Sequence, residues 1–197
     1  TIQDFYQGIY IYNSAPVIRN NKITDPYGNG VYGEANGKSP LIQGNSIKKI
    51  NTNLLAYQGI YLLNYTNPFI NGNDIRGFDF GIYCGGGGTG YLTNSSYSTP
   101  AVNNRLTNND IGLTSAWGHY LYAGLAETPT TGYSGSYNSI YSNNNYDATA
   151  YESGYLMAQV NWWGSDGAQV SAYSGGYILS TFPMSSDPWG SIALKSI

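Results

Sequence analysis

A six-residue unit that recurs along the chain is the strongest constraint on its fold. Each copy begins and ends with an apolar residue and carries Asn at its fourth position; the copies span residues 18–23, 42–47, 70–75 and 106–111, with a degenerate copy at 141–146. A repeat at intervals of a few tens of residues is typical of a solenoid, in which each coil covers its neighbours. The chain is therefore expected to fold as stacked coils.

A second unit, in which Gly is followed by an aliphatic residue and Tyr, runs in phase with the first. Its copies begin at Gly8, Gly30, Gly59 and Gly81, and residues 118–121 fit as a fifth copy with His119 in the aliphatic position. Alternation of apolar residues with Tyr is strand periodicity. We expect the aliphatic side chains to point inward and the Tyr side chains outward.

The corners of the coils can also be placed. The two apolar ends of the six-residue unit are separated by an odd number of steps, so one straight strand cannot put both on the same face. Asn and Gly at the middle positions tolerate a left-handed backbone and supply the bend. Pro16, Pro40 and Pro68 precede the repeated Asn at a constant spacing and are expected to open a strand.

The repeated asparagines predict a ladder in which each side-chain amide bonds to the coils above and below it. The predicted rungs are Asn21, Asn45, Asn73, Asn109 and Asn144. A track of polar ligands is the alternative role for these side chains.

With these repeated units, the chain resembles the right-handed parallel β-helix repeat proteins found among secreted and cell-surface proteins of bacteria. Residues 161–164 (Asn-Trp-Trp-Gly) and 186–189 (Ser-Asp-Pro-Trp) are similar to segments that close such domains. The resemblance implies an all-β fold, a right-handed parallel β-helix of about 6–8 coils with variable corner loops. We expect coils over 1–164, loop insertions at about 85–99 and 123–137, and a C-terminal cap or strand over 165–197.

Composition limits the partners and the location of the chain. Only 10% of the 197 residues are charged and the net charge is −3. We therefore expect no positively charged surface of the kind that binds nucleic acid. The sequence contains no apolar run long enough to predict membrane insertion. The polar, Tyr-rich composition and the resemblance favour a secreted or cell-surface protein. Cys84 is expected to be a small buried hydrophobe, and the sequons at Asn64 and Asn94 leave glycosylation open.

Acids and bases are sparse and scattered, which argues against an enzyme. His119 is the single histidine, and Asp79, between two Phe residues, is the one acid in an apolar setting. We therefore predict no catalytic residues, no cofactor and no metal site. A polysaccharide lyase or glycoside hydrolase is kept as a less favoured alternative.

A row of tyrosines is the candidate binding surface. Tyr10, Tyr32, Tyr61, Tyr83 and Tyr120 occupy the outward position of the Gly-aliphatic-Tyr units. Such a row either packs as a surface ladder that stabilises adjacent strands, or stacks against sugar rings.

The leading functional hypothesis is a non-catalytic extracellular structural protein. The sequence begins in the middle of a coil, so Ile2 and Phe5 are expected at an exposed end, while Ile192 and Leu194 form an alternating strand near the other end. These four residues would form the contact of a head-to-tail homopolymer, a filament or surface array. The alternative is a carbohydrate-binding or adhesin module that binds extracellular polysaccharide.

Overall fold

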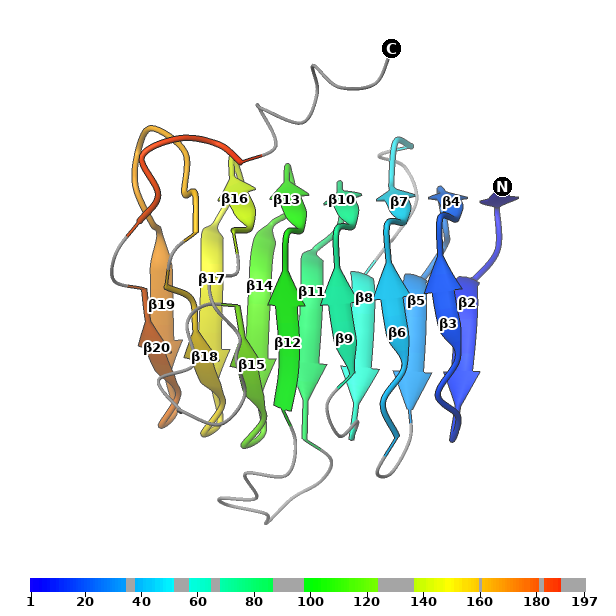
Figure 1. The fold of residues 1–197 in the computed structure, drawn as a ribbon, viewed down its shortest axis with the longest axis horizontal. Coiled ribbons are helices and arrows are strands. Elements are labelled where there is room, and N and C mark those ends of the chain that lie inside the picture. Colours follow the sequence, from blue (N-terminus) through cyan, green and yellow to red (C-terminus); the bar gives the residue numbers. More distant parts are fainter. Residues whose placement is uncertain are drawn as a thin grey trace.

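The fold is a stack of coils whose strands form three parallel sheets (Figure 1). The computed structural model of the chain describes residues 1–34, 38–51, 57–64, 68–86, 98–123, 137–159, 161–180 and 183–188. Within this part of the chain, no helix is long and apolar enough to cross a membrane.

Each sheet is named here by its first strand. The β1 sheet contains β1 (Ile2–Gln3), β4 (Lys22–Thr24), β7 (Ser46–Lys48), β10 (Asp74–Arg76), β13 (Arg105–Thr107) and β16 (Ser139–Tyr141). The β2 sheet contains β2 (Gln7–Tyr12), β5 (Asn29–Glu34), β8 (Gln58–Leu63), β11 (Phe80–Gly85), β14 (Ile111–Ala116), β17 (Tyr146–Tyr151) and β19 (Val170–Tyr173). The β3 sheet contains β3 (Val17–Arg19), β6 (Leu41–Gln43), β9 (Phe69–Asn71), β12 (Ser98–Val102), β15 (Tyr120–Tyr122), β18 (Tyr155–Met157) and β20 (Tyr177–Leu179).

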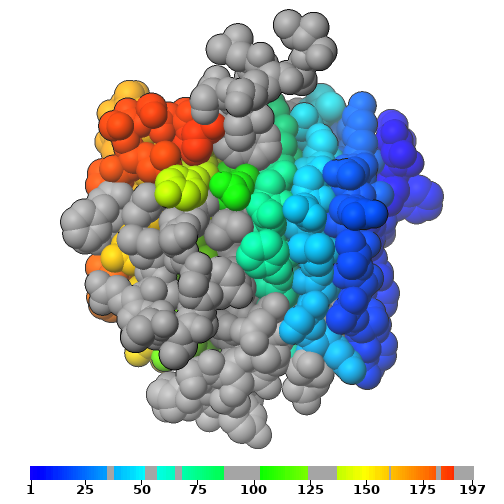
Figure 2. Space-filling view, viewed as in Figure 1, coloured from blue at the N-terminus to red at the C-terminus, as the bar shows by residue number. Residues whose placement is uncertain are grey.

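The chain runs through the sheets in a fixed order, so that successive coils lie side by side, as the colours of Figure 2 show for the described N-terminal residues. The predicted all-β parallel solenoid is confirmed. β19 and β20 pair in parallel with β17 and β18 and add a further coil. The coils therefore extend to Leu179, beyond the boundary predicted at residue 164. Most of the two predicted insertions lies outside the described residues.

The corner between the β3 and β1 sheets has the predicted left-handed backbone. Asn20, Gly44, Gly72 and Asn103, one position before the first four Asn of the ladder described below, have φ values of 56°, 64°, 65° and 52°. This turn redirects the chain between two short strands, and Asn and Gly tolerate it best. Pro16, Pro40 and Pro68 directly precede β3, β6 and β9, as predicted.

Aliphatic side chains stack in columns inside the first coils. In the β2 sheet Val31, Ile60 and Ile82 are paired in register and fully buried. The other two sheets contribute equivalent columns, which include Ile42 and Ile70 from the β3 sheet and Ile47, Ile75 and Leu106 from the β1 sheet. Each coil thus buries its apolar residues against the next one, which is the main stabilising term in a solenoid.

The repeated Gly residues lie where adjacent coils approach too closely for a side chain. A Cβ on Gly30 would lie 2.6 Å from the carbonyl oxygen of Gly59, and one on Gly81 would lie 2.6 Å from that of Gly112. Gly112, not Gly118, is therefore the fifth member of this series. The prediction that residues 118–121 form the fifth Gly unit is wrong, because Tyr120 begins β15 in the β3 sheet.

A continuous asparagine ladder links the coils. Asn45 donates its amide to Asn73 Oδ1 (2.9 Å), and Asn73 donates in turn to Asn104 Oδ1 (3.0 Å). The full set of rungs is Asn21, Asn45, Asn73, Asn104, Asn138 and Asn161. Each Oδ1 that accepts along this ladder also accepts the backbone N–H of the preceding rung. The first three rungs are as predicted.

Two predicted rungs do not belong to this ladder. Asn109 lies at a different corner, where its Oδ1 accepts the N–H of Phe78 (3.1 Å). Asn144 is exposed and donates to Asp110 Oδ1 (2.9 Å). The prediction for Asn109 is wrong because the unit at residues 106–111 is shifted by one corner: Leu106 pairs with Ile75, so it fills the last apolar position of its coil rather than the first. The prediction for Asn144 is wrong because Leu106 pairs with Ile140 and not with Tyr141, so Asn143 takes the position equivalent to Asn109.

The later coils are filled differently from the first ones. Ala148 and Ala150 occupy inward positions of β17. Both belong to the hydrophobic core, and so does Trp163. His119 and Cys84 are fully buried, in agreement with the predicted interior positions. Burial lowers the pKa of His119 to about 3, so its imidazole is neutral in the folded state.

Candidate functional site

The predicted tyrosine row exists over four coils of the β2 sheet. Tyr10, Tyr32, Tyr61 and Tyr83 are paired in register on successive strands. The rings of Tyr10 and Tyr32 stack at 5.5 Å with an angle of 8°, whereas Tyr61 and Tyr83 meet edge to face at 4.9 Å and 84°. Both geometries are favourable for aromatic pairs, so the row stabilises the sheet.

Exposure falls along this row. Tyr10 is 55% exposed, and Tyr12, which lies on the same strand, is 67% exposed; Tyr83 is only 4% exposed. The rings of Tyr10 and Tyr12 are nearly parallel, with centroids 6.4 Å apart. The accessible aromatic surface therefore lies over β2, β5 and β8, and we call Tyr10, Tyr12, Tyr32 and Tyr61 the tyrosine face.

The tyrosine face offers hydrogen bonds as well as apolar area. The Tyr32 hydroxyl donates to Glu34 Oε2 at 3.2 Å. Partial burial, with the nearby Glu34 carboxylate, raises the pKa of Tyr32 to about 12 and raises the pKa of Tyr61. These phenols stay protonated at neutral pH, so they remain donors.

The row ends at an aromatic cluster over β14. The hydroxyls of Tyr83 and Tyr151 hydrogen-bond to each other, although their strands are separated by β14. Trp117 packs beside both rings, with centroid distances of 5.7 and 6.4 Å. Thr114, which pairs with Tyr83 on the outer side of the sheet, is fully buried. The cluster therefore closes the tyrosine face on one side.

Tyr120 is not part of the tyrosine face. It lies in the β3 sheet, where its ring stacks on Tyr155 at 4.6 Å and 6°. Thr114 occupies the position that the prediction assigned to Tyr120. The prediction for Tyr120 is wrong for the same reason as that for Asn109: the sequence units beyond Leu106 were taken one corner out of phase.

Two of the four residues of the predicted assembly contact lie in the described part of the chain. Ile2 begins β1 and packs against the core, and Phe5 is 60% exposed. Ile192 and Leu194 lie outside the described residues. Head-to-tail assembly thus stays a prediction.

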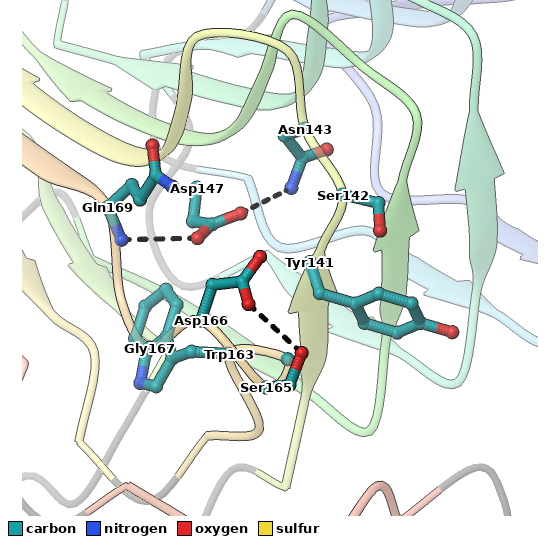
Figure 3. Close-up of a pocket in the computed structure, with 10 residues that line it drawn as sticks. Tyr141, Ser142, Asn143, Asp147, Trp163, Ser165, Asp166, Gly167 and Gln169 are labelled. Atoms are coloured by element: carbon teal, nitrogen blue, oxygen red, sulfur yellow. Dashed lines mark hydrogen bonds between the residues drawn. The ribbon is translucent and has the colours of Figure 1, made fainter.

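A small polar cavity, which sequence reasoning missed, lies at the corner between the β1 and β2 sheets (Figure 3). Its volume is about 160 Å³, and it is lined by Tyr141, Ser142, Asn143, Asp147, Trp163, Gly164, Ser165, Asp166, Gly167 and Gln169. One wall comes from the turn between β16 and β17, and the other from the loop before β19. We call it the corner cavity.

A second, shorter ladder leads into the corner cavity. Asn109 donates its amide to Asn143 Oδ1 (3.3 Å), and Asn143 donates its amide to Asp147 Oδ1 (2.9 Å). The other carboxylate oxygen of Asp147 accepts the backbone N–H of Gln169 at 3.2 Å. Both amides donate in the same sense, toward the carboxylate, and hydrogen bonds aligned in this way polarise and strengthen one another.

Asp147 is the buried acid of this cavity. Its side chain lies on a residue that is 5% exposed. Burial raises the pKa of Asp147; the hydrogen bonds from Asn143 and Gln169 oppose the rise, and the nearby Asp166 carboxylate adds to it. Asp166 is exposed and accepts a hydrogen bond from the Ser165 hydroxyl at 3.1 Å. Two carboxylates therefore share one small pocket whose described lining contains no basic side chain.

The Asn-Trp-Trp-Gly segment builds the far wall of the corner cavity. Asn161 is a rung of the long ladder, and Trp162 forms a parallel bridge with Ser139. Trp163 is buried, with its indole N–H unpaired in the described part of the chain. Gly164 has a φ of 78°, and a Cβ there would come within 3.0 Å of Tyr141. The sequence marked both walls of the cavity, through the degenerate Asn unit at residues 141–146 and the Asn-Trp-Trp-Gly segment. Nothing in the sequence indicated that these two segments lie next to each other.

The other acids are placed as structural or solvated groups. Asp74 bonds to Arg76 (2.6 Å) and to Lys48 (3.1 Å). Burial would raise its pKa, but these two partners outweigh burial and lower it. Asp79 is exposed, contrary to the apolar setting predicted; desolvation and the neighbouring Asp110 raise its pKa. Over the described residues, no group of three or more His, Cys, Asp or Glu side chains is placed to hold a metal.

Stacked parallel sheets, columns of aliphatic residues and an internal asparagine ladder define a solenoid of the parallel β-helix class. A family model described as a right handed beta helix region matches residues 1–124. The chain belongs to this right-handed β-helix family. Comparisons with curated proteins and with solved structures gave no significant match.

Proposed function

We propose that this β-helix domain is a non-catalytic carbohydrate-binding module of a secreted or cell-surface protein. Its binding surface is the tyrosine face, and its ligand is an extracellular polysaccharide that lies across β2, β5 and β8. The observation that carries the proposal is the exposure of Tyr10 and Tyr12, large aromatic side chains that lie side by side on the outer side of the β2 sheet.

The chemistry of the tyrosine face supports a sugar ligand. Aromatic rings pack against the apolar C–H faces of pyranose rings, while phenol hydroxyls and a carboxylate bond to sugar hydroxyls. The Tyr32–Glu34 pair supplies both hydrogen-bonding groups beside the stacked rings. Exposed aromatic area of this kind on one side of a protein marks an interaction site.

The test is affinity electrophoresis against a panel of neutral and acidic polysaccharides, followed by a glycan array. The variant Tyr10→Ala/Tyr12→Ala removes the most exposed rings without touching the core. We expect retardation by at least one polysaccharide, and its loss in the double variant.

Tyr146→Ala is a matched control, because Tyr146 is also exposed and lies on the β2 sheet but away from the tyrosine face. Retardation that survives in the double variant, or that disappears equally in the control, would contradict the assignment of the tyrosine face.

A further inference from the structure

The aromatic row on the outer side of the β2 sheet continues beyond Tyr83. The ring of Trp117 packs on Tyr83 at 5.7 Å and on Tyr151 at 6.4 Å, and Tyr173 stacks on Tyr151 at 5.3 Å. Trp117 directly follows β14 and completes the row where Thr114 has no ring to offer. Each of the seven strands of this sheet, which lie side by side in Figure 1, therefore has one ring in an unbroken row.

The exposure of the row is lost at Tyr83 and returns beyond it. Tyr83 is 4% exposed, whereas Trp117 is 37% and Tyr173 is 51% exposed. The accessible part of the row thus consists of two areas, the tyrosine face over β2, β5 and β8 and a second area over β14, β17 and β19. We call Trp117, Tyr151 and Tyr173 the distal aromatic group.

The position of Trp117 is unusual for a large side chain. Trp117 and Gly118 are the central residues of a tight turn, with φ values of 52° and 70°, in which the N–H of His119 donates to Ala116 O at 3.1 Å. A turn with two positive φ values favours Asn or Gly. A bulky residue in this conformation is an outlier of the kind that gathers at functional sites. The backbone therefore does not explain Trp at this position, and its side chain must.

A glycine of the preceding coil makes room for the indole. A Cβ on Gly85 would lie 2.7 Å from Cε3 and 3.1 Å from Cζ3 of Trp117. The six-membered ring of the indole therefore fills the space that a side chain at Gly85 would need, and its contacts with Tyr83 and Tyr151 restrain it further. An exposed ring that packing already holds in place loses little conformational freedom when a ligand binds.

A carboxylate lies beside the distal aromatic group, as Glu34 does at the tyrosine face. Glu152 is exposed and takes the turn position of Trp117 in the next coil, where its carbonyl oxygen accepts the N–H of Gly118 at 3.2 Å. Burial is the main cause that raises the pKa of Tyr83, and the nearby Glu152 carboxylate adds to the rise. A carboxylate accepts hydrogen bonds from sugar hydroxyls and repels an acidic polysaccharide.

The spacing of the row suits a linear polymer that lies along the stack. Neighbouring strands are about 4.8 Å apart, close to the length of one extended pyranose unit. Six such steps separate β2 from β19, so the row is about 29 Å long. A chain of about six sugar units would reach both exposed areas, whereas a short one would reach only one of them.

We propose that the distal aromatic group is a second sugar-binding subsite, and that one linear, uncharged polysaccharide chain occupies it together with the tyrosine face. Pyranose units pack against the rings of Trp117 and Tyr173, and their hydroxyls donate to Glu152. The inference rests on the proposed function, because the tyrosine face binds the other part of the same chain. It adds a further contact and a minimum length for the ligand.

Isothermal titration calorimetry on the full chain tests the second subsite. The probes are linear, neutral β-1,4-linked gluco-, manno- and xylo-oligosaccharides from the dimer to the octamer. In the series that binds, we expect the affinity to keep rising up to about the hexamer, the length of the row, because a second subsite on the same chain multiplies the affinity. Affinity that no longer rises beyond the trimer, the length that the tyrosine face alone accommodates, would overturn the proposal.

Variants assign the added affinity to the distal aromatic group. Trp117→Asn removes the indole and suits the left-handed backbone, and Tyr173→Ala removes the most exposed ring of the group; urea unfolding checks that both variants fold. We expect each to weaken hexamer binding about threefold to tenfold, the value of one aromatic contact, and to leave trimer binding unchanged. Tyr177→Ala is the matched control, because Tyr177 belongs to the same coil as Tyr173 and is 47% exposed, but lies in the β3 sheet.

The second subsite and the proposed function fail in different ways. Absence of binding for every oligosaccharide and polysaccharide would overturn both. Binding that is lost in Tyr10→Ala/Tyr12→Ala but unchanged in Trp117→Asn and Tyr173→Ala would support the tyrosine face and overturn the second subsite. Equal weakening by Tyr177→Ala would overturn its location, and preferential binding of acidic polysaccharides would overturn the uncharged ligand.

Discussion

The coils from β2 to β13 and the coils from β14 to β20 share one backbone plan but fill their interiors differently. In the first region, inward positions carry large aliphatic residues, such as Ile60 and Ile82. In the second region, Ala148 and Ala150 take inward positions, and Trp163 and His119 occupy buried space. The asparagine ladder passes through both regions without a break. The ladder and the strand register are therefore common to both regions, and Ile140, Leu121 and Leu156 continue the aliphatic columns of the β1 and β3 sheets. The difference lies in the β2 sheet, where alanines replace large aliphatic residues.

The largest expected effect distinguishes the long ladder from the short one. Asn73→Ala removes two donated hydrogen bonds, to Ile42 O and Asn104 Oδ1, and two accepted from Asn45, all of them buried. Buried groups left without partners cost roughly 1–3 kcal/mol each before relaxation, so we expect the free energy of unfolding to fall by about 4 kcal/mol. Urea unfolding measures it.

Asn109→Ala is the matched substitution in the short ladder. Its hydrogen bonds are longer, 3.3 Å to Ile75 O and to Asn143 Oδ1. We expect this substitution to lower the free energy of unfolding by about 2 kcal/mol. Equal losses for the two variants would show that the continuous ladder adds nothing beyond local hydrogen bonds.

The second effect is acid sensitivity, which belongs to the later coils because they contain the single histidine. Burial holds the pKa of His119 at about 3, whereas the unfolded chain has a value near 6.5. Between these values the unfolded state binds the extra proton, so stability is full above about pH 6.5 and is lost as the pH falls. At pH 5 the expected loss is about 2 kcal/mol.

His119→Leu removes this dependence. Its unfolding free energy should be nearly flat between pH 7 and pH 5.5, a window above the ordinary titration of carboxylates. Parallel pH profiles for the variant and the natural chain would mean that His119 titrates with an ordinary pKa and is not desolvated in solution.

The same two regions explain which sequence predictions succeeded. Where large aliphatic residues mark the inward positions, the sequence determined the phase of the coils, and Asn21, Asn45 and Asn73 were placed correctly. Beyond Leu106 the phase was lost, because two successive corners both carry Asn in a left-handed backbone: Asn103 has a φ of 52° and Asn108 a φ of 54°. Residue type alone cannot distinguish such corners.

The candidate sites show the same limit. Four members of the tyrosine row were predictable, because strand alternation places them outward in register. The corner cavity was not, because it joins the turn at Asn143 to the loop at Ser165, two segments with no common period. The closing of the row by Tyr151 and Trp117 was equally invisible, since Tyr151 reaches across the coil that contributes both Thr114 and Trp117.

The third effect concerns how tightly the later coils are filled. Ala148 pairs in register with Leu113, and both are fully buried. If the small side chain is matched by Trp163 in the same cluster, Ala148→Leu overpacks the interior and costs about 1.5 kcal/mol. Ile60→Leu in the first region conserves volume and should cost less than about 1.5 kcal/mol. An unchanged or raised stability of Ala148→Leu by urea unfolding would reveal an unfilled void in the later coils.

The smallest effect lies at the boundary between the two regions, where Tyr83 and Tyr151 bridge over β14. Tyr151→Phe removes one hydroxyl of the pair and leaves the Tyr83 hydroxyl, on a residue 4% exposed, without that partner. We expect a loss of about 1 kcal/mol, the net value of one such hydrogen bond. Tyr173→Phe, on the neighbouring exposed ring stacked on Tyr151 at 5.3 Å, is the control and should change stability little. Equal stabilities of the two variants would mean that ring packing alone joins the regions, and that the hydroxyl pair does not contribute.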